Sequence, residues 1–193
     1  GSGSPSSGPG AARRARRPWA RAVRSHERVG RQVGLEAKAA EMGLTPYQVL
    51  IIASMVEREA KFDEDRPKIA RVIFNRLFLQ MELQIDATLY YGQDPSTPFS
   101  QLKRTPGPYN SYLNKGLPPT PIANPGRASI EAVLNAAPNP SQGDPICRAI
   151  TDGSPCIYLY YVIADEEGHH VFAATLSQHN ANVRAAREKG LLS

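Results

Sequence analysis

The run Val-Leu-Ile-Ile-Ala-Ser-Met-Val at residues 49–56 decides the fold, since every position is apolar or small and the run stops abruptly at Glu57-Arg58-Glu59. A helix that is apolar on nearly every face belongs in the middle of a domain. The residues just before it carry a start signal: Thr45 suits the N-cap, Pro46 suits the first helical position, and Gln48 completes a capping box. The sequence therefore predicts a buried helix that begins at Pro46 and ends in two glutamates.

The segments that flank this helix predict a mixed fold. Apolar residues at helical spacing predict a helix from about residue 67 to residue 80. β-branched and aromatic residues predict a strand over 157–163, which Gly168 turns back into a partner strand at 169–173. Further elements are expected as helices over 35–42, 129–137 (with Ser129 as N-cap) and 177–189, and as a short strand over 81–86. The fold class is accordingly α+β: a buried helix packed with a small antiparallel sheet and Pro/Gly-rich loops.

Proline is concentrated in one stretch of the chain. Residues 94–145 hold 11 of the 17 prolines. Loops of this length are uncommon in a compact domain and usually carry function. We therefore expect this interval to contribute to a binding site.

Charge divides the 193-residue chain into two parts. The net charge is +5, yet residues 1–34 hold eight arginines and one acid, so the rest of the chain, with 15 basic and 17 acidic residues, is slightly negative. Residues 35–193 are predicted to form the folded domain, and residues 1–34 a disordered basic segment or a cloning remnant. The functional alternative for this segment is an arm that binds nucleic acid or anionic lipid. Because the domain itself lacks this basicity, no nucleic-acid partner is expected.

Missing patterns exclude several classes of protein. No run of 18 apolar residues predicts a membrane-spanning helix, and no apolar segment typical of a signal peptide follows the N-terminal arginines. The four histidines form no HExxH-like pattern, and the GxSxG, P-loop and GxGxxG fingerprints are absent. We therefore expect neither a metal site nor a cofactor.

Glu57 is the sharpest candidate for chemistry. It emerges from a buried helix, where loss of hydration would keep its carboxyl protonated near neutral pH, as a glycosidic general acid requires. Glu59 lies about 200° farther round the helix, so the two glutamates cannot share one site and one of them is expected at the surface. Alternatively, both simply begin a polar helix end. Gln84 and Asp86 share one face of the predicted strand over 81–86, and could be a sugar-binding amide and a second carboxylate, or an ordinary strand end.

Cys147 and Cys156 flank a short Gly-Ser-Pro turn in a loop-rich region. Two cysteines cannot form a metal site alone. In an exported protein this pair favours a local disulfide, whereas in a reducing compartment the residues would remain two thiols.

Several of these stretches resemble one known family, the endolytic murein transglycosylases, also described as the MltG or YceG-like proteins of bacteria. The matching motifs are IASMVERE at 52–59, VIFNRL at 72–77, MELQIDATLYYG at 81–92, YNSY at 109–112, GLPPTPIANPG at 116–126, HVF at 170–172 and HN at 179–180. They occur in the family's order and span about residues 44–184. The chain therefore resembles the catalytic domain of this family.

The resemblance implies an activity and a partner. It implies an endolytic lytic transglycosylase that cleaves the MurNAc-GlcNAc β-1,4 bond of nascent peptidoglycan strands and leaves 1,6-anhydroMurNAc ends. A non-catalytic peptidoglycan-binding module is the alternative. Peptidoglycan strands are the expected partner, and the cell-wall synthesis machinery is a further candidate partner.

The resemblance also implies a set of site residues. It places the catalytic glutamate at Glu57, in agreement with the argument from the buried helix. The residues expected to bind substrate are Gln84, Asp86, Tyr109, Asn110, Tyr112, Asn124, His170, His179 and Asn180. Family members often have proline after the aspartate of the LQxD stretch, where this chain has Ala87.

Location follows from the same resemblance. Family members usually begin with a short cytoplasmic segment, one membrane-spanning helix and a LysM-like subdomain, and residues 1–34 stand where these would be. The full-length protein is therefore expected to be anchored in the cell membrane with its catalytic domain outside the cytoplasm, and the present chain to be a soluble fragment of it.

Overall fold

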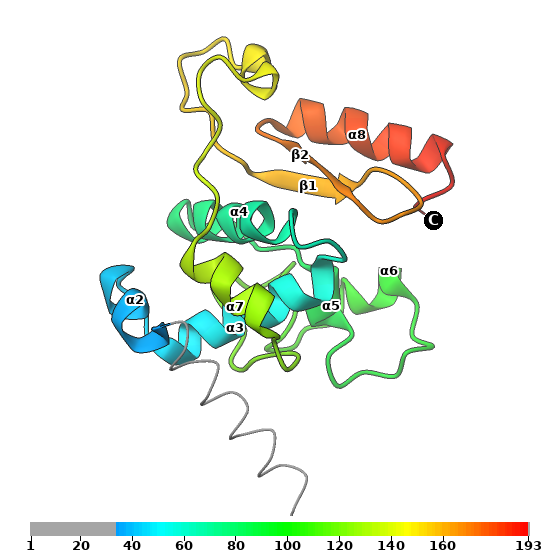
Figure 1. The fold of residues 1–193 in the computed structure, drawn as a ribbon. Helices are drawn as coiled ribbons and strands as arrows, with labels where there is room; N and C mark the ends of the chain where they lie inside the picture. The colour runs from blue at the N-terminus through cyan, green and yellow to red at the C-terminus, as the bar shows by residue number, and fades with distance from the viewer. Residues whose placement is uncertain (1–33, 193) are drawn as a thin grey trace, which may run out of the picture.

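The computed structural model describes residues 34–192, so the predicted disordered basic segment lies almost entirely outside the described residues. Helices and strands follow one another in the order shown in Figure 1. The elements are α2 (Leu35–Glu41), α3 (Pro46–Glu59), α4 (Arg66–Phe78), α5 (Asp86–Leu89), α6 (Phe99–Leu102), α7 (Arg127–Leu134), the 3-10 helix η1 (Pro145–Ala149), β1 (Tyr160–Ile163), β2 (His170–Ala173) and α8 (Leu176–Glu188).

Helix α3 begins as its sequence predicts. The hydroxyl of Thr45 accepts a hydrogen bond from the backbone N–H of Gln48, and the Gln48 side chain accepts one from the backbone N–H of Thr45. This confirms the capping box, with Pro46 in the first turn. The box satisfies two N–H groups that the helix itself cannot pair.

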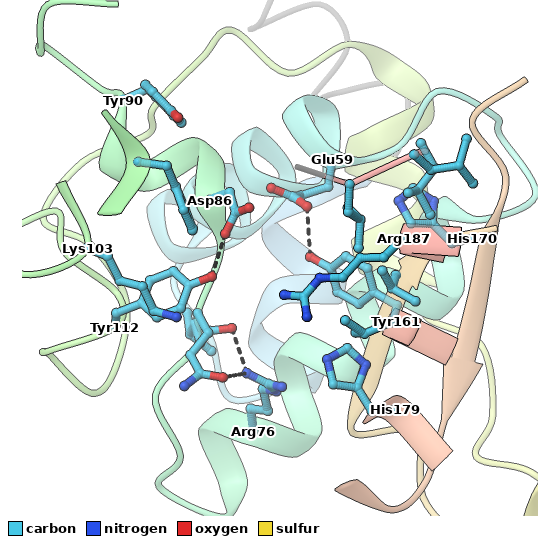
Figure 2. Close-up of a pocket in the computed structure, with 18 residues that line it drawn as sticks. Glu59, Arg76, Asp86, Tyr90, Lys103, Tyr112, Tyr161, His170, His179 and Arg187 are labelled. Carbon is cyan, nitrogen blue, oxygen red and sulfur yellow. Dashed lines mark hydrogen bonds between the residues drawn. The ribbon is translucent and has the colours of Figure 1, made fainter. Parts of the chain in front are cut away.

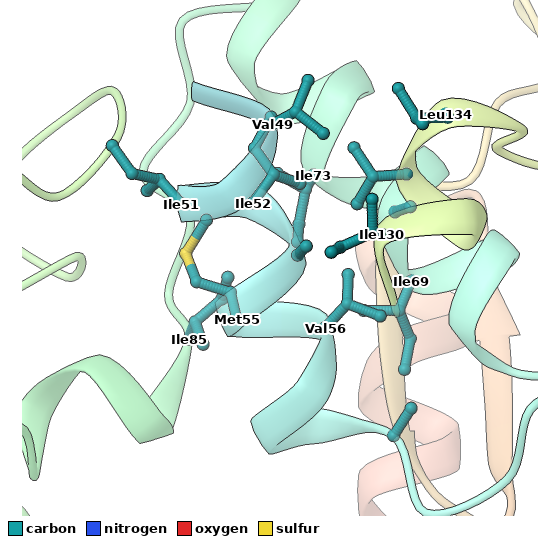
Figure 3. Close-up of a cluster of buried hydrophobic side chains, with 14 of the residues drawn as sticks. Val49, Ile51, Ile52, Met55, Val56, Ile69, Ile73, Ile85, Ile130 and Leu134 are labelled. Carbon is teal, nitrogen blue, oxygen red and sulfur yellow. The ribbon is translucent and has the colours of Figure 1, made fainter. Parts of the chain in front are cut away.

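The hydrophobic core is built around α3 (Figure 3). Ile52, Met55 and Val56 of this helix are fully buried and pack with residues of α4 and α7, including Ile73 and Ile130. Burying one such side chain contributes about 1.5–3 kcal/mol relative to leaving it in water. The core therefore fixes the polar end of α3 in one position. None of the described helices is by itself long and apolar enough to cross a membrane, although α2 and α3 pass that test together as a pair bent by 95°.

The sheet is an antiparallel hairpin of β1 and β2 (Figure 1). Its register pairs Tyr160 with Ala173 and Ile163 with His170. Helix α8 covers one face of the hairpin and α4 lies against β1 on the other. Helices and a small antiparallel sheet together confirm the predicted α+β class.

The strand predicted over residues 81–86 is wrong. Gln84 has a φ of 53°, in the left-handed region that interrupts an extended chain, and α5 begins only two residues later. The segment instead makes one isolated bridge, from Glu82 to Lys115, and pairs with a loop: Ser111 accepts hydrogen bonds from the backbone N–H groups of Gln84 and Ile85. The apolar residues alternate because their side chains are buried against the core, and not because the segment pairs with another strand in a sheet.

Helix boundaries differ from prediction in the proline-rich interval. The N-cap of α7 is Gly126, not Ser129, which lies fully buried inside the first turn. The helix ends at Leu134, short of the predicted residue 137. The short helices α5, α6 and η1 were not predicted, because four or five residues carry no periodic signal.

The structure joins Cys147 to Cys156 by a disulfide across nine residues. In the chain-entropy description, closing a loop of this size contributes on the order of 2–3 kcal/mol to stability. We expect that replacing both cysteines with serine lowers the free energy of unfolding in urea by about this amount. The unfolded, non-reduced protein should show no titratable thiol. Two thiols in protein refolded under air would contradict the pairing.

Candidate active site

A pocket of about 610 Å³ lies between the end of α3, the loops around α5 and α6, and the hairpin with α8 (Figure 2). Five segments that are distant in sequence each place a polar side chain in it: Glu59, Arg76, Asp86, Tyr112 and Tyr161. A concave site with a few convergent polar groups is the expected form of a ligand or active site. We take this pocket as the candidate active site.

Glu59 lies at the pocket wall as the last residue of α3. The Tyr161 hydroxyl donates a hydrogen bond to its Oε2 atom at 3.1 Å, and the backbone N–H of Ala87 approaches Oε1 at 3.5 Å. Burial of the carboxyl, with a smaller contribution from the nearby Asp86 charge, raises the pKa of Glu59 to about 7. A carboxyl of this kind is partly protonated at neutral pH and can both donate and accept a proton.

Glu57 lies outside the pocket and its side chain points away from that of Glu59, although it is only two residues away in sequence. Its Oε2 atom accepts hydrogen bonds from the Ser129 hydroxyl at 2.6 Å and from the backbone N–H of Gly126 at 3.1 Å. Arg66 forms an ion pair with the same atom at 3.4 Å, and the Glu57 side chain is 31% exposed. Glu57 thus ties the first turn of α7 to α3. Of the two glutamates, the one expected to be catalytic therefore lies outside the pocket, and Glu59 lines it. Their side chains face different parts of the structure, as helical geometry predicts.

Asp86 is the second carboxylate of the pocket. It is exposed toward the pocket, yet desolvation by the surrounding walls raises its pKa, opposed by the hydrogen bond from the Tyr112 hydroxyl and by the charge of Lys103. Burial of Tyr112 and the adjacent Asp86 raise the pKa of Tyr112, so its hydroxyl keeps its proton and donates a hydrogen bond to Asp86. The Lys103 ammonium stands 4.5 Å from the centroid of the Tyr112 ring.

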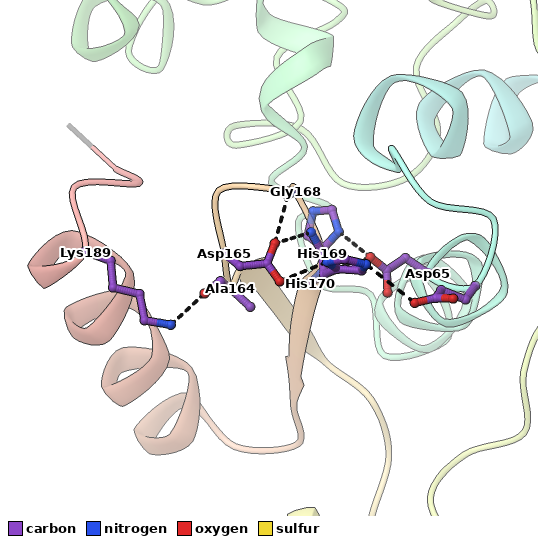
Figure 4. Close-up of polar contacts among 8 residues, drawn as sticks. Asp65, Ala164, Asp165, Gly168, His169, His170 and Lys189 are labelled. Carbon is purple, nitrogen blue, oxygen red and sulfur yellow. Dashed lines mark hydrogen bonds and ion pairs between the residues drawn. The ribbon is translucent and has the colours of Figure 1, made fainter.

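Two histidines reach the pocket from the sheet and from α8 (Figure 4 shows the first). His170 is oriented by Asp65, whose Oδ2 atom lies 3.0 Å from the ring Nδ1 atom and also accepts from the His170 backbone N–H. His179 stacks on Tyr160 with 5.0 Å between ring centroids. Burial, and to a lesser degree the charge of Arg76, lowers the pKa of His179, which is therefore neutral at pH 7.

Comparison with known proteins assigns the chain to a family. The profile of the YceG-like family matches residues 12–185. The chain belongs to the YceG-like family. It is 38% identical over 149 residues to an endolytic murein transglycosylase of Bacillus subtilis, a match that covers 76% of this chain and 35% of that protein. It is 31% identical over 147 residues to an endolytic murein transglycosylase of Streptococcus pneumoniae, covering 72% of this chain and 24% of that one.

A solved structure shows the same fold. The crystal structure of a YceG-like protein from Listeria monocytogenes superposes with a TM-score of 0.59 at 33% identity, over 75% of this chain and 41% of that chain. The family assigned from the sequence motifs is thereby confirmed. The chain spans only about a third of the Bacillus relative and a quarter of the Streptococcus relative.

The YceG-like pocket gathers some of the predicted substrate-binding residues and leaves others out. Those that line it are Gln84, Asp86, Tyr112, His170 and His179. Those that do not are Tyr109, Asn110, Asn124 and Asn180.

The residues outside the pocket have structural surroundings of their own. The Asn110 amide is buried and donates to the carbonyls of Leu102 and Thr105, so it holds a loop together. The Tyr109 hydroxyl pairs with the Thr120 hydroxyl at 2.8 Å. Asn124 and Asn180 are exposed elsewhere. Tyr109 and Asn110 therefore make hydrogen bonds within the surrounding loops. Of the YNSY motif, only Tyr112 lines the pocket.

Sequence reasoning missed several pocket residues of this YceG-like chain, among them Arg76, Lys103, Tyr161 and Arg187. Tyr161 was interpreted only as a strand residue. The signal that could have found it is the alternation along β1, which turns Tyr160 and Tyr161 to opposite faces of the hairpin. Nothing in the sequence, however, indicates that one of these faces meets the end of α3.

The β1–β2 turn of this YceG-like domain holds three candidate metal ligands within 4.8 Å, Asp165, Glu167 and His169. The Asp165 carboxylate already accepts hydrogen bonds from the backbone N–H groups of Gly168 and His169, and its second oxygen lies 2.9 Å from the His169 ring (Figure 4). These contacts explain the cluster as a turn stabilised by its own aspartate.

Proposed function

We propose that this domain is a peptidoglycan lytic transglycosylase in which Glu59 is the catalytic carboxyl. The observation that carries the proposal is the Glu59 carboxyl at the pocket wall, with a pKa raised to about 7 and a hydrogen bond from Tyr161 that fixes its orientation. The family and the names of the two relatives support the same reaction class. The bond cleaved would be the β-1,4 bond from MurNAc to GlcNAc.

One carboxyl suffices for this chemistry because the nucleophile is part of the substrate. Glu59 donates its proton to the oxygen that leaves with GlcNAc as the C1–O bond of MurNAc breaks. The C6 hydroxyl of the same MurNAc attacks C1, and its proton passes to Glu59, which regains its starting form. The product is a 1,6-anhydroMurNAc end. Intramolecular attack has a large advantage over attack by water once the sugar is held in the required ring shape.

Asp86 supports the reaction without transferring a proton in this scheme. Its carboxylate lies on the same side of the pocket as Glu59 and is held by the Tyr112 hydroxyl. A fixed negative charge there would stabilise the positive charge that develops on the sugar ring as the bond breaks. Tyr161 positions Glu59, and Gln84 offers its amide to the sugar.

Mass spectrometry of digestion products tests this proposal. Purified sacculi are incubated with the protein in ¹⁸O-labelled water, with Glu59→Gln as the inactive control. We expect 1,6-anhydro ends and no label in the products. Reducing ends that contain ¹⁸O would identify a hydrolase, with Asp86 as its second carboxylate. Binding to sacculi without any product would identify a non-catalytic peptidoglycan-binding module.

The proposed substrate also implies a location. Because peptidoglycan lies outside the cytoplasmic membrane, we propose that the domain works there, as part of a longer membrane-anchored protein that acts on nascent strands beside the synthesis machinery. The disulfide between Cys147 and Cys156 suits an oxidising compartment. Labelling of the natural full-length protein in intact cells with a membrane-impermeant reagent distinguishes the two sides of the membrane.

A further inference from the structure

Arg76 is a buried cation without a carboxylate partner. Its residue is only 6% exposed, and no acid forms an ion pair with it within the described residues. Its Nε atom donates to the carbonyl of Leu159 at 2.7 Å. Its Nη1 atom donates to the carbonyls of Glu82 and Leu83 at 3.0 and 2.9 Å and to the side-chain oxygen of Gln84 at 3.3 Å. Every one of these acceptors is neutral.

Such a charge is costly to bury, and the chain compensates for it only in part. The Tyr160 ring lies 5.1 Å from the guanidinium carbon and provides a cation–π contact. Burial lowers the pKa of Arg76, as expected for a cation taken out of water. Neutral acceptors satisfy hydrogen bonds, but they do not neutralise a formal charge.

One end of the guanidinium remains available to a ligand. The second terminal nitrogen, Nη2, makes no hydrogen bond within the described part of the chain, although Arg76 lines the pocket. Among the described residues, the side-chain atom that is both buried and unpartnered is Nδ1 of His179, so Nη2 of Arg76 keeps access to solvent. Figure 2 shows Arg76 between Tyr112 and His179, on the side of the pocket opposite Glu59.

The contrast with Arg71 shows that this arrangement is specific to the pocket. Arg71 lies on the same helix, α4, and also donates to neutral backbone carbonyls, those of Ala136 and Ala137. It lies outside the candidate active site. Arg71 therefore fastens a loop away from the candidate active site, whereas Arg76 fastens a loop and presents a charge to that site.

We propose that Arg76 is a specificity-determining residue that binds a carboxylate of the substrate through Nη2. Glu59 and Asp86 lie toward one side of the pocket and Arg76 toward the other. Two further cations, Lys103 and Arg187, also line it. An anionic sugar is repelled from the first side and attracted to the second, which selects one orientation of the strand. A guanidinium whose other nitrogens are already fixed loses little entropy when it binds a carboxylate. The proposal rests on the proposed function for its substrate class.

The two sources of such a carboxylate are the lactyl group of MurNAc and the stem peptide. They are separated by titrating the wild-type domain with four ligands and following binding by NMR: N-acetylmuramic acid, its methyl ester, muramoyl dipeptide and the carboxyl-amidated form of that dipeptide. None of these monosaccharides contains a scissile glycosidic bond, so binding is measured without turnover. We expect the acid to bind about tenfold more tightly than the ester if the lactyl carboxylate is recognised. Tighter binding of the dipeptide than of its amidated form, with acid and ester equal, would identify the stem-peptide carboxylate.

Variants then locate the effect. Arg76→Gln should remove the preference for the carboxylate, Arg76→Lys should retain part of it, and the matched control Arg71→Gln should retain all of it. If Arg76→Gln does not fold, the comparison of ligands on the wild-type domain still decides. Equal binding of charged and uncharged ligands overturns the proposal, and so does a preference that persists in folded Arg76→Gln and disappears in Lys103→Gln or Arg187→Gln. Cleavage of sacculi is scored separately, so a domain that cleaves but ignores the carboxylate would refute this inference and leave the proposed function standing.

Discussion

Glu59→Gln is expected to lower turnover of peptidoglycan by about 10²- to 10⁴-fold while the domain stays folded. The amide is close to the carboxyl in shape and can still accept the hydrogen bond from Tyr161. It cannot give a proton to the leaving oxygen and take one back from the C6 hydroxyl. The measurement is the rate of release of anhydromuropeptides from sacculi, with the thermal unfolding curve as the check on folding.

Glu57→Gln is the matched control, because it makes the same change two residues away on the same helix. Glutamine can still accept from the Gly126 N–H and the Ser129 hydroxyl, and loses only its ion pair with Arg66. For a side chain that is 31% exposed, this loss should cost less than about 1 kcal/mol of stability. Turnover should stay within about twofold of wild type. If the two variants behave the other way round, the pocket around Glu59 is not the active site.

The pair of glutamates also shows how far sequence reasoning reaches in this chain. Apolar residues and the capping box fix the length, start and burial of α3, because these depend on nearest neighbours along the helix. Helical geometry then separates Glu57 from Glu59. Which of them faces a pocket depends on where α7 and β1 pack, and that is a tertiary fact. The sequence predicts that the two glutamates face different sides, but the preference for Glu57 had no information on which side meets the pocket.

The residues around Gln84 and Asp86 were placed in the site correctly although their secondary structure was predicted wrongly. Both residues were expected in the site and both line the pocket, although the strand used to place them does not exist. Alternating burial of Leu83 and Ile85 looks the same whether it arises in a ladder or in a loop pinned by Ser111. Residue chemistry was therefore a safer guide than secondary structure here. Arg76 was missed for a related reason: its position on an amphipathic helix is typical of a solvated residue, and only the fold of residues 82–84 buries it.

We expect the rate of cleavage to decrease at alkaline pH as the Glu59 carboxyl loses its proton. Since the acid must be protonated in the free enzyme, kcat/KM should approach a tenfold decrease for each pH unit well above about 7, and should fall about 50-fold between pH 7 and pH 9. Glu59 and Asp86 interact, so the measured midpoint belongs to the pair. A profile that stays flat through pH 9 would exclude a carboxyl of this kind as the proton donor.

Two variants should move this alkaline limb in opposite directions. Asp86→Asn removes the negative charge that helps to raise the pKa of Glu59, so the limb should move to lower pH. Tyr161→Phe removes the hydrogen bond that stabilises the ionised carboxylate and lowers the pKa of Glu59, so the limb should move to higher pH. The position of the limb is compared, not the height of the plateau, because both changes also affect how substrate and transition state are held. A general loss of structure would lower the plateau without moving the alkaline limb in opposite directions. Shifts of the limb in the same direction in both variants would exclude Glu59 as the group that titrates.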